Sequence, residues 1–212
     1  MDEYLLWPAG ALFCERGSDK PPRSLPARLR RLSKRLVPVD INMDEAALRK
    51  IVAQSIEGVV LPSCRHGSDV QHLDVLLSVA EAEEGREDGT TRILGLTHGV
   101  LPPPMSSDGF IGKSRRLIGL TFDPDALQSF IGASRQRDEA GQWTPAFVNA
   151  RLAVLLAAKA AGIPAYDAPA TLSGEPLRID CRLSRADGFE GRLTNDPDQI
   201  DTINAAYGQA AV

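Results

Sequence analysis

The chain has 212 residues, of which 43% are hydrophobic and 25% are charged, so it is long enough to bury one substantial core in a single α/β domain. Its formal net charge of −4 argues against a general binder of nucleic acid or of anionic membranes, because both need a basic face that replaces counterions. We therefore expect one domain over residues 1–212, with neither nucleic acid nor membrane as a partner.

The cysteines and the first residues bear on the cellular compartment. Cys14, Cys64 and Cys181 lie far apart without paired spacing, which indicates reduced thiols rather than a disulfide frame or a zinc site. No segment has the apolar length of a membrane span, and the acidic residues Asp2 and Glu3 do not resemble the basic start of a secretory signal. The expected location is the cytoplasm.

Apolar runs of strand length alternate with helix-length segments along the whole chain. The expected strands cover residues 9–14, 36–41, 58–61, 93–97, 117–122, 163–166 and 189–194. The expected helices cover residues 24–35, 43–55, 68–84, 125–133, 151–161 and 177–186. Strands joined by helix-length connections predict a parallel sheet covered on both faces, whose closed form is the TIM-type (β/α) barrel.

The number of strands sets the form of this barrel. Seven strands are one short of the usual eight, and the shortfall lies at the N-terminus, where residues 4–7 are a candidate for a remnant strand. The sequence therefore predicts a barrel that is incomplete or truncated at its N-terminus. Because an incomplete barrel leaves an edge strand uncovered, we expect a homo-oligomer.

Two segments interrupt the alternation of strands and helices. Residues 98–113 contain three consecutive prolines and a glycine, which is typical of a loop after a strand, on the face where barrel enzymes place their sites. Residues 135–144 are polar and include Gly141, which fits either a mobile lid or a solvated connection.

The most specific pattern lies in residues 188–200, which read Gly-Phe-Glu-Gly-Arg-Leu-Thr-Asn-Asp-Pro-Asp-Gln-Ile. This segment resembles the closing segment Gly-Phe-x-Gly-Lys-x-x-Ile-His-Pro-x-Gln-Ile of the citrate lyase β subunit and its relatives, the HpcH/HpaI-type aldolases. The matching positions are Gly188, Phe189, Gly191, Pro197, Gln199 and Ile200. Arg192, Asn195 and Asp196 replace the family's Lys, Ile and His. The alanine-rich helix from Arg151 to Gly162 fits the same family, so the chain resembles a short, divergent member.

The resemblance implies a carbon–carbon lyase of the aldolase type that acts on an oxo-acid or an acyl thioester. In that family Mg²⁺ or Mn²⁺, held by a Glu and an Asp, stabilises an enolate, and an Arg binds the substrate carboxylate. This chain departs from the pattern after two strands. Asp40-Ile41-Asn42 stands where the family shows Arg-x-Asn. Where a Glu before a Thr is expected the chain reads Gly95-Leu96-Thr97, so that Gly95 or Thr97 takes the ligand position, depending on the register.

Five residues remain as candidates for the site. Asp125 matches the second metal ligand of the family, or else it is a helix cap or first-turn residue. Glu15 falls where the family has an acidic motif, and it is a catalytic candidate. His98 follows a strand, and it is either a proton-transfer group or a solvent-facing loop residue. Asn42 and Asp196 are candidates for substrate binding.

Two functions follow from these departures. The first is a divergent citrate lyase β subunit-like protein whose lyase activity is weakened or altered. The second is a non-catalytic barrel that acts as a binding or scaffold subunit, since fold does not carry function with it. Convergence of the candidate residues in one pocket would favour the lyase.

Overall fold

The computed structural model describes residues 10–14, 34–54 and 56–208, in which helices follow most of the strands, while a loop without a helix joins β4 to β5. The strands are β1 (Gly10–Cys14), β2 (Lys34–Pro38), β3 (Gly58–Leu61), β4 (Arg92–Thr97), β5 (Leu117–Phe122), β6 (Ala165–Asp167) and β7 (Gly191–Thr194). The helices are α2 (Glu45–Ala53), α3 (Gly67–Glu83), α4 (Pro124–Ile131), α5 (Pro145–Ala160), α6 (Gly174–Ala186), the 3-10 helix η1 (Pro197–Gln199) and α7 (Ile200–Tyr207).

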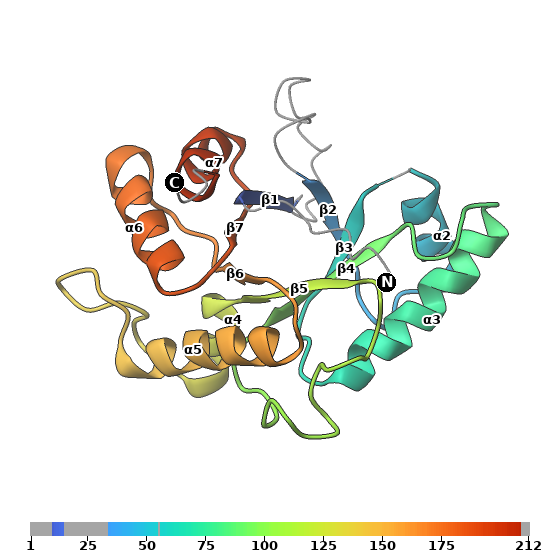
Figure 1. Ribbon diagram of the computed structural model, residues 1–212, viewed down its shortest axis with the longest axis horizontal. Coiled ribbons are helices and arrows are strands. Elements are labelled where there is room, and N and C mark those ends of the chain that lie inside the picture. Colours follow the sequence, from blue (N-terminus) through green and yellow to red (C-terminus); the bar gives the residue numbers. More distant parts are fainter. Residues whose placement is uncertain (1–9, 15–33, 55, 209–212) are drawn as a thin grey trace.

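The seven strands form a closed parallel barrel with the helices on its outside (Figure 1), so the predicted TIM-type fold is confirmed. Closure takes place between the first and last strands, where Gly10 pairs with Gly191 and Phe13 with Thr194. The expected open edge was wrong for the described strands, because β1 is paired with β2 on its other side. The candidate strand at residues 4–7 lies outside the described residues.

One expected helix is corrected at its end. Residues 24–33 lie outside the described residues, but Lys34 and Arg35 open β2 rather than close a helix. The reason is pairing on both sides, since Leu36 lies opposite Cys14 on β1 and Gly58 on β3.

The barrel interior is filled with apolar side chains, as the two-residue period of strands requires. Its buried members are Leu12, Leu36, Val60, Leu94, Ile118, Tyr166 and Leu193. A larger apolar layer lies between the strands and the helices and includes Ile93, the neighbour of Leu94. Gly119 leaves room for the Tyr166 ring, because a Cβ there would come within 2.7 Å of Cε2. The inside of the barrel is thus a packed core rather than a channel.

Helices begin soon after strands end, and polar side chains cap their first turns. The Asp44 side chain accepts a hydrogen bond from Ala47 N at 2.9 Å, and the Asp123 side chain accepts one from Ala126 N at 3.0 Å. Gly132 ends α4 in the left-handed region at φ 67°. Within the described ranges, no helix has the length and apolar character needed to cross a membrane.

A buried ion network joins the last two strands to the helices around them. Asp167 at the end of β6 lies opposite Arg192 on β7, with 3.0 Å between carboxylate and guanidinium. Arg151 of α5 donates to both oxygens of Asp167, and Arg192 also pairs with Asp180 of α6. Burial alone would raise the pKa of Asp167, but Arg192 and Arg151 hold it below its usual range.

We expect Asp167→Ala to lower the free energy of unfolding by about 3–5 kcal/mol, because Arg192, 1% exposed, loses its buried carboxylate partner. Urea unfolding followed by circular dichroism measures this loss. The control Glu175→Ala removes an exposed ion pair with Arg178 and should cost no more than about 1 kcal/mol. Equal losses in the two variants would contradict the role given to Asp167.

Candidate functional site

A cavity of about 590 Å³ opens at the carboxyl ends of the strands, where barrel enzymes place their sites. We call it the mouth cavity. Its lining consists of Cys14, Leu96, Asp123, Pro124, Asp125, Gln136, Arg137, Trp143 and residues 169–172 and 193–195.

The floor of the mouth cavity is apolar. Cys14, Leu96 and Leu193 line the cavity and pack on the interior core below it. Because side chains alternate along β4, Leu96 occupies the lining position, and the expectation that Gly95 or Thr97 would do so was wrong. A Cβ on Gly95 would point at Leu120 and Cys64 in the outer apolar layer.

Two carboxylates line one wall. Asp123 is the N-cap of α4, and Asp125 lies in the first turn, exposed, where its Oδ1 accepts a hydrogen bond from Gln136 Nε2 at 2.6 Å. The first-turn interpretation of Asp125 is therefore confirmed, and the cap itself is Asp123. Its role as a metal ligand stays a prediction.

Residues 135–144, the segment expected as a mobile lid or a solvated connection, supply three lining residues to the mouth cavity, although the sequence did not single out Arg137 or Trp143 as site residues. An isolated antiparallel bridge joins Arg137 to Trp143, and the Arg137 guanidinium lies 3.7 Å from the centre of the Trp143 ring. Arg137 Nη1 donates to Gly141 O at 2.8 Å, and Nη2 lies 3.6 Å from Asp180. Because Gln136 lines the cavity with these two residues, the segment forms part of the cavity wall, and its role as a mobile lid stays a prediction.

Asn42 lines a different hollow, of about 600 Å³, beside the ends of β2 and β3. Asp40 also lines it, and its Oδ1 accepts hydrogen bonds from Asn42 N at 2.8 Å and Asn42 Nδ2 at 3.3 Å. The Asp40 carboxylate is thus engaged in a local turn through Oδ1. Ser63, on the same hollow, has φ 54°, a conformation that non-glycine residues rarely adopt.

His98 lies beneath an aromatic ring and lines neither cavity. Its side chain is buried, at 6% exposure of the residue, so the solvent-facing alternative was wrong. Nδ1 accepts a hydrogen bond from Val100 N at 3.2 Å, and the imidazole stacks on Phe130 with ring centres 5.0 Å apart. Nε2 is buried without a hydrogen-bond partner in the described part of the chain. Burial, followed by the positive charge of Arg65, lowers the pKa of His98.

The remaining candidates do not join Asp125. Asp196 accepts a hydrogen bond from Asp198 N at 3.0 Å at the start of η1, and its neighbour Asn195 lines the mouth cavity instead. Glu15 lies outside the described residues. The candidates that the structure describes are thus separated: Asp125 and Asn42 line different hollows, His98 is buried, and Asp196 caps η1.

The described donors fit Mg²⁺ or Mn²⁺ poorly. Hard cations prefer several carboxylate oxygens, but Leu96 occupies the β4 position, and both mouth carboxylates already accept hydrogen bonds at the positive end of a helix. Across residues 10–14, 34–54 and 56–208, no group of three or more His, Cys, Asp or Glu is placed to hold a metal ion.

Comparison with curated proteins finds citrate lyase β subunits. The chain is 28% identical over 162 residues to the subunit of Leuconostoc mesenteroides subsp. cremoris, covering 76% of this chain and 52% of that protein. It is 25% identical over 175 residues to the subunit of Haemophilus influenzae, covering 82% and 58%. The chain thus spans little more than half the length of these relatives. No family model matches it.

Solved structures show the same fold. RipC from Yersinia pestis superposes with a TM-score of 0.68 at 22% identity, covering 99% of this chain and 98% of that one. The citrate lyase β subunit from Mycobacterium tuberculosis, complexed with oxaloacetate and magnesium, gives a TM-score of 0.60 at 21% identity, covering 82% and 72%. Together with the curated relatives, these structures confirm the resemblance that residues 188–200 indicate.

The burial of His98 predicts its titration. We expect its pKa, followed by NMR of the imidazole, to lie below the ordinary value of about 6.5, because the folded chain disfavours the charged form. Protonation then favours the unfolded chain, so His98 costs stability as pH falls below about 6.5. Phe130→Ala should expose the ring and raise the pKa, whereas a His98 pKa above 6.5 in the wild type would contradict the buried site.

Proposed function

The chain is a citrate lyase β-like protein, and from this premise we propose that it is a carbon–carbon lyase of the aldolase type with weakened or altered activity. Its substrate would be a small oxo-acid or an acyl thioester bound in the mouth cavity. The observation that supports the proposal best is that Arg137 and Asp125 line the same cavity at the carboxyl ends of the strands.

Arg137 is the proposed anchor for an anionic substrate. Its guanidinium lies over the Trp143 ring, 3.7 Å from the ring centre, and the contact with Asp180 at 3.6 Å is too long for a close ion pair, so donors remain for a substrate carboxylate. Trp143 in turn stacks on the buried Phe147, with ring centres 6.0 Å apart, which holds the indole in place. A planar guanidinium held in this way recognises a carboxylate with less loss of side-chain entropy.

Asp125 is the proposed acid–base group. In an aldol cleavage, a base removes the proton of the hydroxyl group as the neighbouring carbon–carbon bond breaks, and the hydroxyl carbon becomes a carbonyl. The bonding electrons stay with the acyl fragment as an enolate, which then takes up a proton. Asp125 is exposed to the cavity and can accept the first proton through the oxygen that Gln136 does not bind.

A divalent cation would find few ligands in the described part of this site. The relative from Mycobacterium tuberculosis was crystallised with magnesium, but the described donors of this chain suit such a cation poorly. An enolate without a cation beside it gains little electrostatic stabilisation. We therefore propose low turnover that Mg²⁺ or Mn²⁺ raises only slightly.

The alternative function is a barrel that binds a small anion without chemistry. It is favoured by the separation of the candidate residues, which do not converge in one pocket, and by the hydrogen bonds that Asp123 and Asp125 already accept. Arg137 lines the mouth cavity in either case. Both functions require the anchor, and they differ in whether Asp125 contributes to a reaction.

Oxaloacetate binding tests the anchor. In a Trp7→Phe background Trp143 is the remaining indole, so its fluorescence should change as the ligand binds beside it. We expect Arg137→Gln to weaken binding about tenfold, the usual scale for one charge-assisted hydrogen bond. The control Arg135→Gln removes the same charge at an exposed position that does not line the cavity, and it should bind like the parent. Equal binding by both variants would contradict the anchor.

Turnover distinguishes the two functions. We expect slow cleavage of malyl or citramalyl thioesters by the wild type, and no cleavage by Asp125→Ala. Because Asp125 is not the N-cap of α4, the fold should survive this substitution, as circular dichroism can check. Ligand binding without any cleavage would favour the binding barrel, and robust metal-dependent cleavage unchanged in Asp125→Ala would refute the site.

We also propose that the chain forms a homo-oligomer, although its barrel closes. The support is an apolar row on the outside of α5, where Val148, Leu152 and Leu156 are each about half exposed and recur every four residues. Light scattering at micromolar concentration should give a multiple of 22.8 kDa, and Leu152→Glu should shift it toward the monomer. A mass near 22.8 kDa for the wild type would contradict the assembly.

A further inference from the structure

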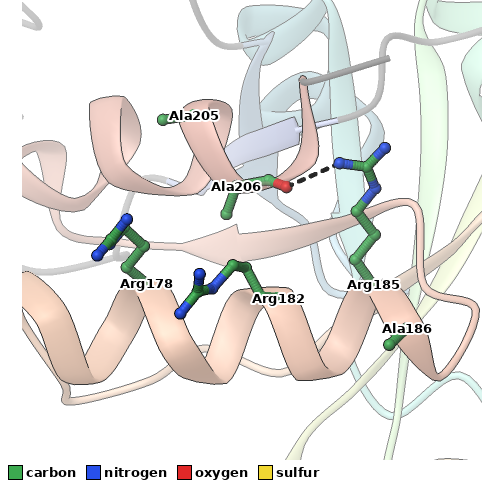
Figure 2. Close-up of a pocket in the computed structure, with 6 residues that line it drawn as sticks. All are labelled: Arg178, Arg182, Arg185, Ala186, Ala205 and Ala206. Atoms are coloured by element: carbon green, nitrogen blue, oxygen red, sulfur yellow. Dashed lines mark hydrogen bonds between the residues drawn. The ribbon is translucent and has the colours of Figure 1, made fainter. Parts of the chain in front are cut away.

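A groove between α6 and α7 carries a row of arginines on the outside of the barrel (Figure 2). Its volume is about 500 Å³. The lining residues, which we call the arginine groove, are Arg178, Arg182, Arg185, Ala186, Ala205 and Ala206. They share no member with the mouth cavity, so a ligand here would not compete with the proposed substrate.

The row follows from helical spacing. Intervals of four and three residues place Arg178, Arg182 and Arg185 on one face of α6, toward α7 (Figure 2). Seven residues at a rise of about 1.5 Å extend the row by about 10 Å. The small side chains of Ala205 and Ala206 on α7 leave the hollow open between the two helices.

The three arginines differ in their partners. Arg178 donates two hydrogen bonds to Glu175, each 2.6 Å long, and Arg185 donates to Ala206 O at 3.2 Å, which fixes the two ends of the row. Arg182, between them, is exposed, and its side chain makes no hydrogen bond or ion pair with the described residues. The groove thus carries three arginines, and Glu175 balances the charge of one of them.

We propose that the arginine groove binds a small molecule that carries two or more phosphate groups. Guanidinium groups match phosphate oxygens in pairs of hydrogen bonds, and phosphate brings more negative charge per group than carboxylate. A row about 10 Å long exceeds the size of one phosphate and suits a chain of phosphates. The alanine floor provides apolar space for the organic part of the ligand.

This binding site is independent of the proposed lyase activity. Arg182 touches neither the mouth cavity nor the buried ion network around Asp167, so its substitution should leave both unchanged. Asp180, which lies on another face of α6, pairs with Arg192 instead. The groove can therefore be tested whether or not the chain has lyase activity.

Calorimetric titration with tripolyphosphate in low-salt buffer tests the proposal. We expect the wild type to bind, Arg182→Gln to bind about tenfold more weakly, and added NaCl to weaken both. The control Arg115→Gln removes one exposed arginine outside the groove and should bind like the wild type. Thermal melts should give the same Tm for all three proteins, because surface substitutions change stability little.

Four outcomes would overturn the assignment. One is the absence of binding to the wild type at millimolar tripolyphosphate, and another is an equal loss in Arg182→Gln and Arg115→Gln, which would indicate a general charge effect. A third is inorganic phosphate binding as tightly as tripolyphosphate, since a row of arginines would then bring no advantage. The last is polyglutamate displacing tripolyphosphate at equal charge, which would identify a surface for acidic peptides.

Discussion

The buried ion pair between Asp167 and Arg192 holds the part of the molecule on which the mouth depends. The two residues lie opposite each other on β6 and β7, next to the seam where β7 meets β1. Two parallel strands can pair in more than one register. The register of β6 and β7 is favoured in which the two charged side chains meet in the buried layer between the strands and the helices. The same alignment places Thr194 and Asn195 at the rim of the mouth cavity.

The network also connects the strands to the helices and to residues 135–144. Asp167 binds Arg151 of α5, and Arg192 binds Asp180 of α6, which lies 3.6 Å from Arg137 at the mouth. A second buried pair, Glu81 with Arg116, lies 2.8 Å apart and joins α3 to the residue that precedes β5. In both places the arginine provides the hydrogen bonds and the opposite charge that water would otherwise provide, and the buried carboxylate can therefore remain charged.

Helix α6 has two separate tasks in this arrangement. Asp180 faces the barrel and takes part in the ion network, while Arg178, Arg182 and Arg185 face α7. Leu177 and Cys181 are fully buried between these faces and keep the helix on the barrel. The helical period places these charged residues on two different faces of α6, so one set contacts the barrel and the other faces the groove.

The sequence by itself determined the order of strands and helices, because the apolar pattern of a strand and that of a helix can each be recognised from neighbouring residues alone. It also identified residues 188–200 as the closing segment, and β7 with η1 lies there. Only the tertiary structure decided that Gly10 pairs with Gly191, that Leu96 faces the mouth, and that His98 lies under Phe130. The physical reason is that a local pattern sets an element, whereas register, side-chain direction and burial depend on contacts between residues far apart in the chain. Arg137 shows this clearly, because its polar surroundings in the sequence resemble a solvated loop, whereas its contact with Asp180 of α6 and its place in the lining of the mouth cavity come from the fold.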